Sequence, residues 1–280
     1  MIENTNAYKL YGIPYLGSMV VEFLMEEAGI EYEIIFLSPE ERRSSEFKKI
    51  SPRGLIPVLI TPDGTSMFEG LAIINFLLET HQTNLIAPIG DPDRAKCYQW
   101  LSFLSTALGN ANNRFFFPER YGSIEKVIKE KAELDRKACY DILEKYSDPF
   151  LSGKTLGIAD FYFYMFMQWD ENKMAELAKR PNLVKMYSRV DQIPSIQKIM
   201  KNHKKKQYLH VTDLKFAINI FIENQYCIVG ADHRGESLTQ QIVIPERWVL
   251  VLGGEAHGLS ETTKKNLNRT LSIQKSGSGE

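Results

Sequence analysis

The strongest constraint on the fold is a short apolar segment entered through a proline, Leu55-Ile56-Pro57-Val58-Leu59. Residues 56–60 have the apolar pattern of a strand, and Phe68-Glu69-Gly70 follows just before an apolar helical pattern. An X-Pro bond in a tight turn can be cis, and the N–H and carbonyl of the preceding residue, Ile56, are then turned outward. An extended peptide can hydrogen-bond such an exposed pair as an added strand does.

Two neighbouring residues offer further contacts to a peptide. Glu69 can pair with an amine, and a helix that starts at Gly70 presents free N–H groups and its positive dipole end to a carboxylate. Taken singly, Pro57 is an ordinary turn proline and Glu69 a solvated helix start. In combination they fit a small extended peptide with an amine and carboxylates at its ends, and glutathione is such a molecule.

In this order the residues resemble the N-terminal domain of the glutathione transferase family, where an NPxGxVPxL segment and a later Glu-Ser pair hold the tripeptide. The resemblance implies a thioredoxin-like domain over residues 1–82 that binds glutathione through Ile56, Pro57, Glu69 and Gly70. The chain departs from the family at Gly70, which replaces the serine whose hydroxyl meets a carboxylate. Losing a hydrogen bond to a charged group costs about 1.5–3 kcal/mol, or roughly ten- to hundredfold in affinity.

The pattern of the first domain agrees with this fold. Strands are expected at residues 8–11, 32–37, 56–60 and 66–68, and helices at 20–28, within 38–49 and at 71–79. The resulting order β-α-β-α-β-β-α is that of a thioredoxin-like domain. The first helix is similar to that of a bacterial subgroup in which the helix opens with Gly-Ser and carries an early Glu, here Gly17, Ser18 and Glu22.

Three side chains are candidates to activate a thiol. A hydroxyl at a helix N-terminus, such as that of Ser18, can donate to a thiolate, and the helix dipole favours the same anion. Serine is also a preferred N-cap residue, so capping and thiolate contact are equally good interpretations and one hydroxyl can do both. Counted back from Gly29, Tyr11 stands where several classes of the family keep a catalytic tyrosine. Tyr15 stands where other classes keep a serine or a cysteine. We rank Ser18 first, then Tyr11, then Tyr15.

Residues 92–203 are predicted to form an all-helical domain like the second domain of the family. An aromatic stretch interrupts its first helix, and Phe115 and Tyr121 are candidates, beside Tyr11 and Tyr15, to line a pocket for an electrophile. Residues 123–146 read as one long amphipathic helix. Its apolar stripe is expected to be core or a helix interface: Ile124, Val127, Ile128, Leu134, Ala138, Ile142 and Leu143.

A second diagnostic segment, residues 151–160, is similar to the capping box that precedes a buried helix in the family. The family has Ser or Thr at the cap, whereas this chain has Gly157, answered three residues later by Asp160. We expect Asp160 to be structural, and the apolar residues 161–169 to form the buried centre of the helical domain.

Bulk properties exclude several classes of protein. The net charge of −1 gives the whole chain no electrostatic attraction to nucleic acid or anionic membrane. Cys97, Cys139 and Cys227 are far apart with no CxxC, which argues against a disulfide framework or a metal site and suits a reducing compartment. The first residues lack the pattern of a signal peptide, and no apolar run is long enough to cross a membrane. We expect a cytoplasmic protein.

The last segment, residues 211–280, has a different pattern. A helix is expected at residues 217–224, and strands near 226–231 and 248–252 are followed by a Gly-rich loop and a second helix. It resembles the C-terminal part of the knotted (SpoU-type) RNA 2′-O-ribose methyltransferases, which use S-adenosylmethionine, and would be a partial α/β fragment. The resemblance places a vestigial S-adenosylmethionine loop at Leu252, Gly253, Glu255, Gly258 and Leu259. The family's first motif has no counterpart here and its third is incomplete, so we expect no methyl transfer.

The sequence therefore predicts α+β and all-α domains followed by a partial α/β fragment. The first hypothesis is a homodimeric glutathione transferase that conjugates the glutathione thiol to a small-molecule electrophile. The second is a transferase-like scaffold with weak or no catalysis. The third is RNA methylation by the last segment, with RNA as partner and S-adenosylmethionine as cofactor only if that segment is functional.

Overall fold

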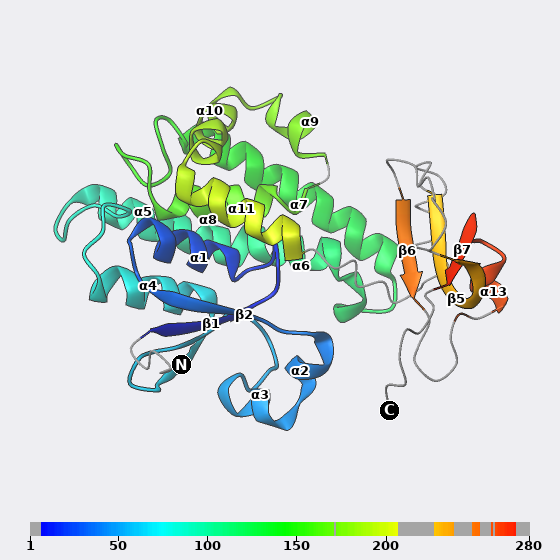
Figure 1. The fold of residues 1–280 in the computed structure, drawn as a ribbon. Coiled ribbons are helices and arrows are strands. Elements are labelled where there is room, and N and C mark those ends of the chain that lie inside the picture. The colour runs from blue at the N-terminus through cyan, green and yellow to red at the C-terminus, as the bar shows by residue number, and fades with distance from the viewer. Residues whose placement is uncertain are drawn as a thin grey trace. The chain divides into compact units, whose positions relative to one another are not determined.

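The computed structural model describes residues 7–170, 172–206, 227–237, 248–252, 259 and 261–272. The chain divides into two compact units, Met1–Gln207 and Tyr208–Glu280 (Figure 1). In these described ranges, no helix is both long and apolar enough to cross a membrane.

The first unit begins with a four-stranded sheet in the order β2-β1-β3-β4. Its strands are β1 (Tyr8–Gly12), β2 (Tyr32–Phe36), β3 (Val58–Ile60) and β4 (Ser66–Phe68). β1 runs parallel to β2 and antiparallel to β3, and β3 runs antiparallel to β4. This is the mixed sheet of a thioredoxin-like domain. The predicted order of elements along the chain, β-α-β-α-β-β-α, is confirmed except that two short helices replace the middle one.

Four helices accompany this sheet: α1 (Met19–Glu27), α2 (Pro39–Arg43), α3 (Ser45–Ile50) and α4 (Gly70–Thr80). α1 and α4 lie on the side of the sheet that faces the helical domain, and α2 and α3 lie on the other side (Figure 1). The charged segment forms two short helices because Ser44 ends α2 in an extended conformation and then caps α3 by accepting from the Phe47 N–H.

The rest of the first unit is helical. It contains α5 (Pro92–Phe103), a π-helical turn (Leu104–Leu108), α6 (Gly109–Phe116), a 3₁₀ turn (Pro118–Arg120), α7 (Glu125–Tyr146), α8 (Ile158–Met167), α9 (Lys173–Leu177), α10 (Pro181–Asp191) and α11 (Pro194–Lys206). Every residue of α8 is buried, as its apolar sequence predicts. The ring of Phe23 on α1 contacts those of Phe161 and Tyr164 on α8, so sheet domain and helical domain share one core.

The start of α8 explains why glycine replaces the usual capping serine. A Cβ atom at Gly157 would lie 2.3 Å from the Leu85 carbonyl oxygen and 2.8 Å from Ser152 Oγ, so no side chain fits there. Ser152 supplies the missing cap from outside the helix, because its Oγ accepts from the Ala159 N–H at 3.2 Å. Asp160 accepts from the N–H groups of Gly157 (2.9 Å) and Leu151 (2.8 Å).

Most of the apolar stripe predicted on α7 lies outside the core. Ile124, Val127, Leu134 and Ile142 are 43–65% exposed, and Ala138 is exposed as well. The helix buries a different face, which carries Ala132, Arg136, Cys139, Tyr140 and Leu143. Only Leu143 of the predicted stripe is buried. Arg136 is also buried on this face of α7, although charged side chains are usually found at the surface.

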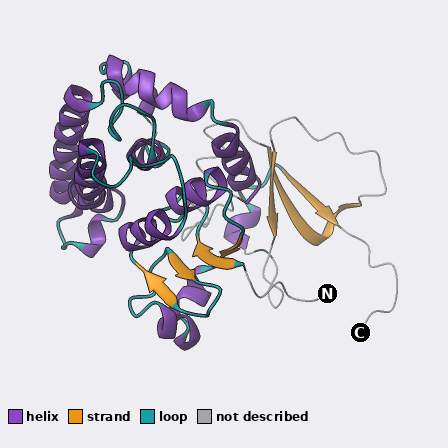
Figure 2. Ribbon diagram, turned by 90° about the vertical axis from the view of Figure 1, so that its left-hand side faces the viewer, coloured by secondary structure: helices purple, strands orange, loops and turns teal. Residues whose placement is uncertain are grey.

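The described part of the second unit contains a parallel sheet in the order β6-β5-β7, seen as three adjacent arrows in Figure 2. Its elements are β5 (Cys227–Ser237), β6 (Trp248–Leu252), α13 (Glu261–Lys264) and β7 (Arg269–Ser272). The Ile228 N–H donates to Asn268 Oδ1 at 2.6 Å, and the Ile228 carbonyl accepts from the Asn268 N–H. The two strands expected from the sequence are confirmed, and the helix expected at residues 217–224 lies outside the described residues.

Candidate functional site

Three segments that are far apart in the sequence meet at one edge of the first sheet, which is an edge formed by the ends of strands and not by an outer strand. This edge holds the end of β1, the start of β3 and the N-termini of α1 and α4. A Cβ atom at Gly70 would lie 3.5 Å from Pro57 Cγ, and one at Gly17 would lie 3.9 Å from Pro57 Cδ. The Ile56–Pro57 bond is cis, as the sequence suggested. The structure therefore brings Gly17, Pro57 and Gly70 together around the proline ring.

The backbone at this edge is open to a ligand. Ile56 is half-buried, and within the described residues no hydrogen bond uses its N–H or carbonyl. Glu69 is exposed and has φ 70° and ψ 111°, a conformation that non-glycine residues rarely adopt. Strained residues of this kind cluster at ligand-binding sites, where the surrounding structure holds them in place. The antiparallel pairing of Phe68 with Val58 fixes the residue just before Glu69.

Ser18 lies at the start of α1 but points inward. Its side chain is fully buried, and its Oγ donates to the Ile13 carbonyl at 3.4 Å without capping the helix. This distance is long for an O–H···O hydrogen bond, so the bond is weak. A Cβ atom at Gly12 would lie 2.3 Å from Ser18 Oγ, so the glycine makes the room that the hydroxyl occupies.

The two tyrosines are placed differently. Tyr11 is half-buried on β1. Its ring packs against that of Phe47 on α3, and the two ring centroids are 5.8 Å apart. Tyr15 has φ 63°, and burial raises the pKa of its hydroxyl. Its backbone N–H donates to His203 Nδ1 at 3.0 Å, and its carbonyl accepts from Trp169 Nε1. Helical-domain residues thus hold the loop that precedes α1.

A cavity of about 560 Å³ opens beside this loop. Its lining is mainly aromatic and apolar: Tyr15, Leu16, Phe116, Phe117, Gln168, Trp169, Lys173 and Met200. Of the sequence candidates for an electrophile pocket, it contains Tyr15. The Phe115 ring lies 4.3 Å from the Arg136 guanidinium carbon, and Tyr121 is 47% exposed. Phe116 and Phe117 belong to the aromatic stretch that the sequence singled out. Trp169 was expected in the buried centre of the helical domain, but it is half-buried and lines this cavity.

Comparison with known proteins agrees with this geometry. Residues 6–79 match the family described as Glutathione S-transferase, N-terminal domain, and residues 115–203 match Glutathione S-transferase, C-terminal domain. The first unit belongs to the glutathione S-transferase family. Residues 183–280 match the SpoU rRNA Methylase family, as the sequence of the last segment suggested.

Individual relatives of this glutathione S-transferase unit are distant. Glutathione S-transferase GstA of Escherichia coli O157:H7 is 23% identical over 193 residues, which cover 68% of this chain and 95% of the relative. Elongation factor 1-gamma 3 of Oryza sativa subsp. japonica is 27% identical over 161 residues, 56% of this chain and 36% of that protein. The crystal structure of a Sulfitobacter glutathione transferase homologue with bound glutathione has a TM-score of 0.65 and 19% identity, covering 70% of this chain and 98% of that one.

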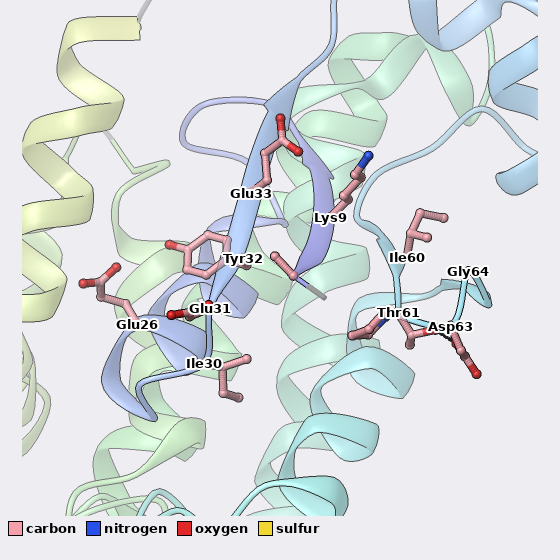
Figure 3. Close-up of a pocket in the computed structure, with 12 residues that line it drawn as sticks. Lys9, Glu26, Ile30, Glu31, Tyr32, Glu33, Ile60, Thr61, Asp63 and Gly64 are labelled. Carbon is pink, nitrogen blue, oxygen red and sulfur yellow. Dashed lines mark hydrogen bonds between the residues drawn. The ribbon is translucent and has the colours of Figure 1, made fainter. Parts of the chain in front are cut away.

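A second hollow of the glutathione S-transferase unit lies at the opposite edge of the sheet, where β1 and β2 begin and β3 ends (Figure 3). It measures about 850 Å³, and its rim carries Glu26, Glu31, Glu33 and Asp63 with one cation, Lys9. None of the predicted site residues lies in it. The edge that gathers Gly17, Pro57 and Gly70 is therefore the candidate functional site.

The remaining sequence candidates are in the second unit. Leu252 ends β6, and Leu259 is buried with Ile228 and Val251. Gly253, Glu255 and Gly258 lie outside the described residues. In the part of the chain that the structure describes, no cluster of three or more His, Cys, Asp or Glu side chains could hold a metal ion.

Proposed function

We propose that the first unit binds glutathione and conjugates its thiol to a small-molecule electrophile. The observation that carries the proposal is the convergence of Gly17, Pro57 and Gly70 at one edge of the sheet, beside an aromatic cavity. The Sulfitobacter relative with the same fold was crystallised with glutathione. Isothermal titration of the full chain with glutathione tests the proposal: one ligand bound per chain supports it, and no binding at millimolar concentrations contradicts it.

Each part of the tripeptide has a partner at this edge. The free N–H and carbonyl of Ile56 bind the cysteinyl part as an added strand would. Glu69 is exposed and pairs with the γ-glutamyl amine, while the N–H groups at the start of α4 receive a carboxylate at Gly70. The electrophile occupies the cavity lined by Tyr15, Phe116 and Trp169, whose rings suit an apolar or aromatic compound.

Ser18 is the proposed thiol contact. Its hydroxyl is buried and makes a weak 3.4 Å bond to the Ile13 carbonyl, so this role requires the hydroxyl to leave that carbonyl and turn toward the thiolate when glutathione binds. We expect Ser18→Ala to raise the thiol pKa of bound glutathione by about one pH unit, because the thiolate loses one hydrogen bond. Folding should be nearly unaffected, since the hydroxyl does not cap α1. The ultraviolet absorbance of the thiolate, followed against pH, measures the effect.

Tyr11→Phe and Tyr15→Phe are the matched controls for this titration. Each removes one hydroxyl near the same edge and keeps the ring. If Ser18 is the contact, both variants leave the thiol pKa close to that of the wild-type complex. A rise in Tyr11→Phe or Tyr15→Phe, with none in Ser18→Ala, transfers the role to that tyrosine.

A non-catalytic scaffold is the second candidate, and Gly70 is the observation that favours it. The family's serine hydroxyl is absent there, so glutathione loses one hydrogen bond to a charged group. A relative, elongation factor 1-gamma 3, shows that chains similar to this one are not all named transferases. The absence of conjugation in a chain that still binds glutathione would favour this candidate.

We further propose that the unit forms a homodimer through α7. Its outward stripe of Ile124, Val127, Leu134 and Ile142, extended by Tyr146, is 43–65% exposed. Exposed apolar residues that recur along one face of a helix are typical of a protein interface. We expect Leu134→Glu to shift the protein from dimer to monomer in sedimentation velocity, because a charge would be buried without a partner.

Lys126→Glu is the control for the dimer prediction. Lys126 is on the same helix, its side chain is 88% exposed, and it stands off the stripe. The variant changes the charge of α7 at least as much as Leu134→Glu does, so general repulsion would act in both. A monomer in both variants, or a dimer in both, contradicts an interface on the stripe.

A cytoplasmic location remains a proposal. Cys97, Cys139 and Cys227 are free thiols. Burial raises the pKa values of Cys97 and Cys139 to about 11, so both stay protonated and unreactive at neutral pH. Unpaired cysteines of this kind suit a reducing compartment.

A further inference from the structure

The loop before α1 is held by a buried histidine from the far end of the helical domain. His203 is fully buried on α11 and uses both ring nitrogens. Its Nδ1 accepts from the Tyr15 N–H at 3.0 Å, and its Nε2 lies 2.9 Å from Glu22 Oε1. Glu22 is 2% exposed and is on α1, one turn after Ser18.

These contacts determine the tautomer. A backbone N–H can only donate, so Nδ1 of His203 must be unprotonated where it meets Tyr15. The ring proton is then on Nε2 and is donated to the Glu22 carboxylate. His203 therefore links the loop to α1. Its Nδ1 accepts from Tyr15 in the loop, and its Nε2 donates to Glu22 in α1.

The ring is also fixed by packing. Tyr15 and Phe36 approach the imidazole edge-on, with centroid distances of 5.5 Å and 5.3 Å and interplanar angles of 86° and 88°. α11 is further joined to α1 by ion pairing of Lys198 with Glu26 and by a hydrogen bond of Ser195 to Glu27. These contacts and the two ring hydrogen bonds together restrain the orientation of the imidazole.

The loop needs such support. Tyr15 has φ 63°, in the left-handed region that costs energy for a residue with a side chain. Its N–H is held by His203 and its carbonyl by Trp169. The same residue lines the cavity proposed for the electrophile, and Gly17 and Ser18 follow directly at the glutathione edge.

We propose that His203 is a positioning residue of this site, which holds Tyr15 in its left-handed conformation through Nδ1 and so sets the shape of the loop of residues 13–18. The proposal deepens the glutathione-binding function proposed above and rests on it for the effect on ligand. His203 does not touch the thiol or the electrophile. It acts through Tyr15, and it loses its effect when the Nδ1 acceptor is lost.

Two substitutions separate the two ring nitrogens. His203→Asn places an amide oxygen near the position of Nδ1, so it keeps the acceptor for Tyr15 and loses the reach to Glu22. His203→Gln places an amide nitrogen near the position of Nε2, so it keeps a donor for Glu22 and loses the acceptor. Glu22→Gln keeps an oxygen for the ring N–H and serves as the conservative control.

Amide hydrogen exchange of residues 13–18 in the full chain, without ligand, is the first readout. We expect exchange about tenfold faster than wild type in His203→Gln and within about threefold of wild type in His203→Asn and Glu22→Gln. Exchange of α8, the buried centre of the unit, is the control for global unfolding. Equal effects in the Asn and Gln variants, or a fully protected loop in His203→Gln, would overturn the proposal.

Titration with glutathione is the second readout. The Kd should rise about tenfold in His203→Gln and stay near the wild-type value in His203→Asn, because the acceptor sets the loop. If the wild-type chain takes up no glutathione, the proposed function fails, and the exchange comparison alone decides whether His203 positions the loop. If wild type binds and the two His203 variants bind equally, the positioning role is wrong and the proposed function stands.

Discussion

Replacing Gly70 with serine is expected to tighten glutathione binding by about ten- to hundredfold, the reverse of the loss that a missing hydrogen bond to a carboxylate causes. The substitution fits the structure. A Cβ atom at this position would meet Pro57 Cγ at 3.5 Å, which is ordinary van der Waals contact. Gly70 is also the first residue of α4, and serine has a higher helix propensity than glycine. Isothermal titration of both proteins measures the change.

Gly70→Ala separates the hydroxyl from the added carbon. It introduces the same Cβ beside Pro57 and the same restriction of the unfolded backbone, but no donor. We expect its Kd to stay within about threefold of wild type, since it adds no hydrogen bond. If serine and alanine have the same effect, the hydroxyl does not meet a carboxylate and the proposed orientation of glutathione is wrong.

Asp160→Ala is expected to destabilise the first unit by about 2–5 kcal/mol, the cost of leaving two buried N–H groups without an acceptor. The carboxylate is fully buried and accepts from Leu151 and Gly157, so it joins the segment before α8 to the first turn of that helix. Urea denaturation monitored by circular dichroism measures the loss. Asp160→Asn keeps one oxygen acceptor and should lie between alanine and wild type.

The same carboxyl gives a pH signature. Burial raises the pKa of Asp160 to about 6, although the N–H donors of Gly157 and Leu151 oppose the rise. The folded state then holds a proton that the unfolded state has released, so this contribution to stability is fully present below the unfolded pKa near 3.8 and is lost as pH rises through about 6. The difference in unfolding free energy between wild type and Asp160→Asn should therefore fall between pH 4 and pH 6. A flat difference would mean that Asp160 is ionised throughout.

The sequence predicted the fold correctly wherever the local sequence pattern and the tertiary structure favour the same element. Pro57 marks the start of β3, and the order of strands and helices follows from the apolar periodicity of the segments. The apolar segment 161–169 predicts the buried α8 correctly as far as Met167, whereas Gln168 and Trp169 follow the helix and are half-buried. Asp160 was expected to be structural, and its hydrogen bonds to two backbone N–H groups have that character.

Side-chain direction could not be predicted in the same way. On α7 the apolar stripe lies outward, because Arg136 is buried by partners distant in sequence: Asn112 at 2.7 Å and Asp170 at 2.7 Å. Ser18 is marked by its place at a helix start, yet its hydroxyl is turned to the Ile13 carbonyl. The link of His203 to Tyr15 joins residues 188 apart, and no local pattern reports such a contact.

The place of His203 in the chain affects how the gene can be shortened. The match to the family's C-terminal domain ends at residue 203, whereas the first compact unit continues to Gln207. An expression boundary chosen from the family match would remove the last turn of α11 and leave a terminal carboxylate on the residue that pairs with buried Glu22. Like charges in a buried setting repel, so such a truncated protein would start with a weakened loop. A stop codon after residue 207 keeps the helix and its histidine intact.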